Sequence, residues 1–153
     1  MAEHKLEMRL NYAKAQPAAL KAMMALEGAA SDGAIPKPLA ELIRLRVSQI
    51  NGCAYCIDMH SRDAMKGGEK VQKLLVVSVW RDSPMFTDKE RAALAWAEAL
   101  TTLPTGHPSD SVYDALSPHF TDAQKVDLTL LIVAINGWNR FGVGFQLVHP
   151  VRD

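Results

Sequence analysis

The two cysteines of the chain, Cys53 and Cys56, form a C-x-x-C motif, and His60 follows the second cysteine by four residues. In a helix each residue advances about 100° around the axis, so these three side chains would project from one face. Unpaired N–H groups and the positive end of the helix dipole favour a thiolate in a first helical turn. His60, one turn from Cys56, can accept a thiol proton or stabilise the thiolate. The spacing therefore indicates a redox-active dithiol in which one cysteine resolves the oxidised form of the other.

Three other interpretations of the cysteine pair compete with this one. Cysteine is most often a small buried hydrophobe, but here both cysteines share one motif with a histidine on the same face. Structural zinc needs four ligands, which Glu41 or a distant histidine would have to complete, and His107, His119 and His149 are scattered. A thioredoxin fold needs a strand before the motif, whereas residues 41–50 have a helical pattern.

Helices are the elements expected to position this motif. Helical periodicity extends almost throughout the chain, and no segment has a convincing strand pattern. The expected helices, about seven, are residues 17–30, 38–52, 53–66, 69–82, 87–101, 109–120 and 122–145. We therefore predict a single all-α domain over residues 1–153, a helical bundle with the C-x-x-C at the N-terminus of a central helix.

Local signals mark where several of these helices begin and end. Pro17 suits a first helical turn, Gly52 follows Asn51 in a turn, and Gly67 is typical of a C-terminal cap. Thr87 and Thr121 are each followed three residues later by Glu or Gln, which is capping-box spacing. The last helix is apolar on most sides, so it must be buried within the fold or against another subunit.

Charge and composition exclude several classes of partner. The chain of 153 residues has 17 basic and 17 acidic side chains, so its net charge is zero. It has no basic excess for nucleic acid and no charge run for an anionic membrane. Residues 130–135, the longest apolar run, are too few to cross a bilayer, and the N-terminus has no signal-peptide pattern. We expect a cytoplasmic protein, where a close cysteine pair is more often catalytic or metal-binding than structural.

Residues 41–64, ELIRLRVSQINGCAYCIDMHSRDA, resemble the core motif of the alkylhydroperoxidase D-like (AhpD-like) proteins of the carboxymuconolactone decarboxylase superfamily. The family pattern is a glutamate on one helix, then C-x-x-C, then a histidine four residues after the second cysteine. The residues that match it are Glu41, Cys53, Cys56 and His60. The core resemblance covers residues 38–79, and segments 86–101 and 130–145 look similar to flanking helices of a branch of small proteins.

The resemblance implies an all-α homo-oligomer, a trimer or hexamer, that reduces peroxides with its dithiol. It implies that Cys56 is the peroxidatic thiol and Cys53 the resolving thiol, while His60 and Glu41 form a proton relay with a water molecule. The sequence has no haem-attachment or dinucleotide motif. No cofactor is therefore expected, and the electrons must come from another, unidentified dithiol.

Tyr55 is a departure from the family pattern, because the best-known members have a histidine directly before the second cysteine. A phenol, with a pKa of about 10, cannot act as a base near neutral pH, but it can donate a hydrogen bond or line a pocket. The substitution does not remove the dithiol chemistry, which depends on the two cysteines. Lactone decarboxylation is less expected, because those members generally lack the cysteine pair. A weakly catalytic redox-responsive oligomer and a metal-binding protein are the remaining alternatives.

Trp138 and Asn139 belong to a segment, INGWNRFG, that resembles a recurring family segment near the active site. A core aromatic residue and a turn or cap residue explain them equally well, so they are not expected to be catalytic. Glu41 alone would be compatible with an ordinary ion pair on a helix surface.

Overall fold

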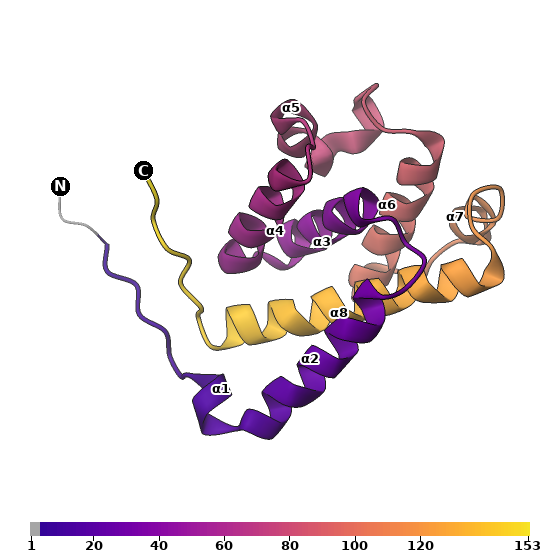
Figure 1. Cartoon of the computed structure of the whole chain (residues 1–153). Coiled ribbons are helices and arrows are strands. Elements are labelled where there is room, and N and C mark those ends of the chain that lie inside the picture. The colour runs from indigo at the N-terminus through magenta and orange to yellow at the C-terminus, as the bar shows by residue number, and fades with distance from the viewer. Residues whose placement is uncertain (1–3) are drawn as a thin grey trace.

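The computed structural model describes residues 4–153, in which every regular element is a helix and none is a strand (Figure 1). The five longest helices are α2 (Pro17–Ser31), α3 (Lys37–Asn51), α4 (Ala54–Lys66), α6 (Asp88–Thr101) and α8 (Asp122–Gly144). The shorter ones are α1 (Tyr12–Ala15), α5 (Val71–Leu75), α7 (Asp110–Asp114) and the 3-10 helices η1 (Val77–Asp82) and η2 (Leu103–Thr105). The predicted all-α class is confirmed.

The predicted helix boundaries follow local chemistry. Pro17 is the first residue of α2, where its missing N–H has no intrahelical partner in any case. Gly52 caps α3 in the left-handed conformation, with φ of 70°, and so permits the sharp turn into α4. Thr87 and Thr121 both form complete capping boxes with the side chains of Glu90 and Gln124.

Helix α3 lies at the centre of the fold. It packs against α4, α6 and α8, while α2 packs against α8 (Figure 1). Its side chains Leu42, Ile43 and Val47 are fully buried. Leu94 of α6 and the α8 side chains Leu128, Leu131, Ile132 and Ile135 complete the core around them. Apolar packing against three helices therefore fixes the position of α3, the helix that carries Glu41.

The prediction of a single helix over residues 69–82 is wrong, because the structure has two short helices there, α5 and η1. Val79 has non-helical dihedrals, φ −122° and ψ 32°. The run of β-branched valines in this segment lowers helix propensity. The Arg91 guanidinium stabilises the break by donating hydrogen bonds to three backbone carbonyls, those of Trp80, Arg81 and Ser83.

The helix predicted over residues 109–120 is also shorter than expected, since α7 ends at Asp114. Turns follow it to His119. Pro118 explains the early end, because a proline disfavours the α conformation of the residue before it and supplies no N–H.

Two helices leave apolar surface uncovered within one chain. Ala30 is the one residue that α2 buries fully. Helix α8 exposes Val126, Val133 and Val143 on the side away from the core. Among residues 4–153, however, no helix is long and apolar enough to cross a membrane.

Candidate active site

The C-x-x-C motif lies at the turn between α3 and α4, as predicted. Cys53 is the N-cap residue of α4 and is joined to Cys56 by a disulfide, with a Cα–Cα distance of 5.3 Å. The Cys53 N–H donates to the Ser48 carbonyl, 3.0 Å away, so the turn is tied to the last turn of α3. Both cysteines are almost completely buried, at 2% and 3% exposed.

The helix N-terminus acts directly on the Cys53 sulfur. The backbone N–H of Cys56 donates to Cys53 Sγ at 3.3 Å. When the disulfide is reduced, this donor and the positive end of the helix dipole favour a thiolate over a thiol. The local structure therefore supports the thiolate chemistry that the spacing of the motif predicts.

His60 and Glu41 form a buried pair across the α3–α4 interface. His60 Nδ1 lies 2.9 Å from Glu41 Oε2, and the two side chains are 9% and 6% exposed. A carboxylate in this position orients the imidazole and fixes which ring nitrogen faces away from it. Glu41 is thus a buried partner of His60 and does not form an ordinary ion pair on the surface. The structure brings together all four residues that the sequence predicted.

Arg44 extends this pair into a network that the sequence analysis missed. Its guanidinium donates to Glu41 Oε1 at 2.8 Å and to Glu27 Oε1 at 2.9 Å. Glu27, on α2, in turn accepts from the indole N–H of Trp138, on α8, at 3.1 Å. Arg44 follows Glu41 by three residues and so shares its helix face, a signal that was readable in the sequence. Glu27 and Trp138 join the network through tertiary packing alone.

The network keeps Glu41 ionised. Burial by itself would raise the pKa of Glu41, but the hydrogen bond and charge of His60 and the adjacent Arg44 guanidinium outweigh it. The pKa of Glu41 is therefore lowered from its usual value. Near neutral pH this residue is a carboxylate, which can stabilise a protonated imidazole but does not itself donate a proton.

A cavity of about 660 Å³ connects the dithiol to the network. Its wall includes Cys56, His60 and Glu41, but not Cys53. The rest of the lining is largely apolar or aromatic and includes Leu20, Met24, Ile35, Met59, Tyr12 and Trp138. Tyr55, which replaces the family histidine, lines the same cavity. It therefore shapes the wall, where a histidine would add a second base.

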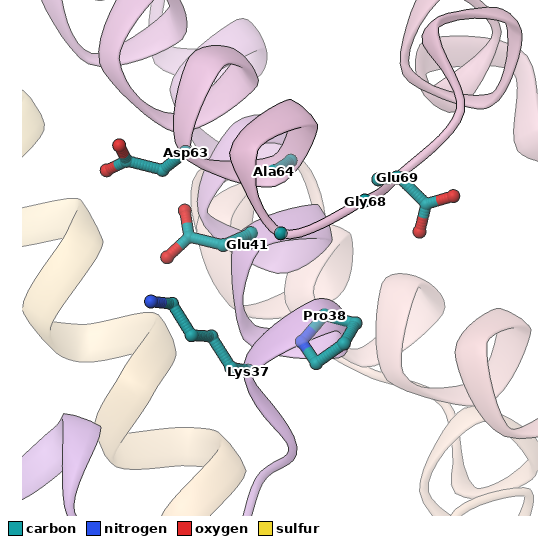
Figure 2. A pocket seen from close by; sticks show the side chains of 8 residues that line it. Lys37, Pro38, Glu41, Asp63, Ala64, Gly68 and Glu69 are labelled. Atoms are coloured by element: carbon teal, nitrogen blue, oxygen red, sulfur yellow. The ribbon is translucent and has the colours of Figure 1, made fainter.

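A second, smaller cavity of about 390 Å³ also adjoins Glu41 (Figure 2). Figure 2 shows the Glu41 carboxylate between the Asp63 carboxylate and the Lys37 ammonium group. Asp63, Glu41 and Lys37 line both cavities. Glu41 thus lies where the two cavities adjoin.

One group of side chains within the described part of the chain is close enough to hold a metal ion. It consists of Glu41, His60 and Asp63, whose candidate ligand atoms lie within 4.8 Å of one another. Glu41, however, already uses one oxygen for Arg44 and the other for His60. A guanidinium in contact with a ligand also opposes a bound cation. The donor set fits an ion-pair network better than a metal site.

Comparison with known proteins gives consistent results. Residues 17–99 match the carboxymuconolactone decarboxylase family. The uncharacterised protein YdfG of Bacillus subtilis is 38% identical over 138 residues, which cover 90% of this chain and 94% of YdfG.

Two solved structures show the same fold. Protein ATU0492 of Agrobacterium tumefaciens, a protein of unknown function with a suggested AhpD antioxidant-defence role, superposes with a TM-score of 0.93 at 44% identity. The match covers 95% of this chain and all of that one. The debrominase Bmp8 superposes with a TM-score of 0.77 at 24% identity, over 87% and 72% of the two chains, and shows likeness of fold alone.

Proposed function

Because this chain belongs to the carboxymuconolactone decarboxylase family and has an AhpD-like dithiol site, we propose that it is a thiol-dependent peroxidase. Its substrates are hydrogen peroxide or organic hydroperoxides, and its electrons come from another dithiol. The observation that carries the proposal is the buried Glu41–His60 pair, which lines the same cavity as Cys56.

The reaction begins at Cys56, since this is the sulfur that lines the cavity. The Cys56 thiolate attacks one peroxide oxygen and breaks the O–O bond, which leaves a cysteine sulfenic acid and an alkoxide. The imidazolium of His60, stabilised by the Glu41 carboxylate, supplies the proton that converts the alkoxide to an alcohol. Among the described residues no direct hydrogen bond joins Cys56 to His60, so a water molecule completes this relay.

Cys53 then closes the catalytic cycle. Its thiolate attacks the sulfenic sulfur, and the disulfide forms as hydroxide leaves and takes up a proton to become water. A dithiol reductant attacks the disulfide, forms a mixed disulfide and is itself oxidised as Cys53 and Cys56 return to thiols. The N–H of Cys56, which contacts Cys53 Sγ, stabilises the Cys53 thiolate as it leaves.

The size of the cavity favours organic hydroperoxides over hydrogen peroxide. A volume of about 660 Å³ far exceeds what hydrogen peroxide needs and lies in the range of small-molecule sites. The apolar wall of Leu20, Met24 and Ile35 gives an alkyl or aryl group a surface to bury.

The proposed setting is a cytoplasmic homo-oligomer, a trimer or hexamer. The exposed valines of α8, Val126, Val133 and Val143, support it, because a second copy of the chain would bury them. Light scattering tests this part of the proposal, and a monomer at micromolar concentration would contradict it.

Single cysteine variants test the chemistry. Cys56→Ser is expected to abolish peroxide consumption in the presence of a dithiol such as dithiothreitol. Without added thiol, Cys53→Ser is expected to consume one equivalent of peroxide and stop at a sulfenic acid, which dimedone traps and mass spectrometry detects. Glu69→Gln, on the far wall of the smaller cavity, is the control and should turn over like wild type.

Two results would contradict the proposal. If both cysteine variants turned over like wild type, the dithiol would not be the catalyst. If wild type formed its disulfide stoichiometrically but did not turn over with any dithiol, the protein would be a redox-responsive module.

A further inference from the structure

We infer that Gly142 of α8 is a positioning residue of the dithiol, which sets the balance between the disulfide and the two thiols. The residue is buried, and an added Cβ atom would lie 2.6 Å from Cys53 Sγ and 3.3 Å from Cys56 Sγ. Side-chain carbons do not approach a neighbour within 3.0 Å without displacing it. Glycine is therefore what allows α8 to pack directly against both sulfurs.

This contact acts on the two redox states unequally. In the disulfide, the S–S bond restricts both cysteine side chains, so neither sulfur can rotate away from α8 by itself. In the dithiol, the sulfurs must move apart in any case, and Cys53 is free to change its rotamer. A methyl group at position 142 would therefore strain the oxidised protein more than the reduced protein.

Asn139, on the same face of α8 and three residues before Gly142, holds the turn in place. Its amide donates to Ser48 Oγ at 3.0 Å, and its oxygen accepts from Asn51 Nδ2 at 2.9 Å. Ser48 also accepts the N–H of Cys53 through its backbone carbonyl. Asn139 thus fixes the distance between α8 and the cysteine turn, while Gly142 leaves room for the sulfurs at that distance.

The inference concerns the equilibrium between dithiol and disulfide, not the reaction with peroxide. It deepens the proposed function by assigning Gly142 as the residue that sets this equilibrium. It rests on the proposed function only in taking the disulfide as a working state. A typical overpacking strain confined to the oxidised form would shift the equilibrium constant by about tenfold toward the dithiol. For a two-electron couple this corresponds to about 30 mV.

The test measures the thiol–disulfide equilibrium of Gly142→Ala in mixtures of reduced and oxidised glutathione, without peroxide. Alkylation of free thiols followed by mass spectrometry gives the fraction in the dithiol form. The expected result is a shift of about tenfold toward the dithiol. Gly144→Ala is the matched control on the same helix, because a Cβ there meets nothing within 4 Å, and it should leave the equilibrium unchanged.

Thermal unfolding of each redox form separates this role from a general packing defect. Gly142→Ala should lower the midpoint of the oxidised protein more than that of the reduced protein. Equal losses in the two forms, or an unchanged glutathione equilibrium, would overturn the inference. If the oxidised form of Gly142→Ala does not fold while the reduced form does, the inference is supported, and failure of both forms to fold counts as an equal loss and overturns it.

Failure of this inference is distinguishable from failure of the proposed function. A wild-type protein that cycles between dithiol and disulfide but consumes no peroxide would refute the peroxidase proposal and leave the role of Gly142 intact. A peroxidase whose Gly142→Ala variant has the wild-type equilibrium would refute the role of Gly142 alone.

Discussion

Replacing Arg44 by methionine would remove the cation that joins Glu41 to Glu27. The methionine keeps much of the length of the side chain but none of its charge or hydrogen bonds. Arg44 is 6% exposed, and its two partners lie 2.8 and 2.9 Å away. The substitution leaves Glu41 buried, with His60 as its remaining partner. It therefore isolates the contribution of the guanidinium to this network.

The expected loss of stability is large because Glu41 cannot regain its hydration. Removing one partner of a buried ion pair typically costs about 3–5 kcal/mol. In a domain of this size each kcal/mol lowers the unfolding midpoint by roughly 2–4 °C, so the midpoint should fall by about 6–20 °C. Glu27 contributes less, since its side chain is 27% exposed and water can solvate it.

Urea denaturation of both proteins at several pH values measures the effect. With Arg44 gone, Glu41 loses one of the contacts that lower its pKa. The carboxyl of the variant should therefore accept a proton at a higher pH than in wild type. The difference in unfolding free energy should be largest near neutral pH and should shrink as the pH falls through about 4.

Arg81→Met is the matched control, because the Arg81 side chain also pairs with a glutamate, Glu98, but is 59% exposed, and Glu98 keeps Arg46 as a second partner. An exposed pair is worth about 1 kcal/mol or less. A loss below about 1 kcal/mol for Arg44→Met, or a loss that does not depend on pH, would refute the electrostatic reasoning. Either result would show that Arg44 stabilises the fold mainly through packing and not through its charge.

Two further predictions concern Glu41 and the turn before the dithiol. Glu41 has a lowered pKa in the folded state, so its stabilising effect is complete above the unfolded value of about 4.3 and is lost as the pH falls through the folded pKa. The free-energy gap between wild type and Glu41→Gln should therefore narrow in acid, and a constant gap from pH 7 to 3 would contradict this. Gly52 has φ of 70°, so Gly52→Ala should cost about 1–2 kcal/mol. Gly28→Ala within α2, with nothing within 4 Å of an added Cβ, should instead stabilise the protein by about 0.5–1 kcal/mol. Equal effects of the two substitutions in urea denaturation would contradict this prediction.

Several helix ends, and the turn that carries the dithiol, were predictable from local sequence. The caps at Thr87 and Thr121, the Gly52 turn and the C-x-x-C at the start of α4 depend on contacts within a few residues along the chain. Such contacts are decided by the residue types themselves. The same reasoning failed over residues 69–82, where Arg91, on the next long helix and 11 residues beyond Trp80, stabilises a break in the helix.

Tertiary structure decided which groups surround the dithiol. Helical periodicity alone places Cys56 and His60 on one face of α4, and the C-x-x-C spacing places Cys53 at the N-cap one turn earlier. That Glu27 of α2 reaches Arg44, and that Gly142 of α8 lies against both sulfurs, depends on how the helices pack. Residues that lie 17 positions apart, as Glu27 and Arg44 do, or much farther, have no fixed geometry until a core of interdigitating side chains sets the distance and rotation of each helix.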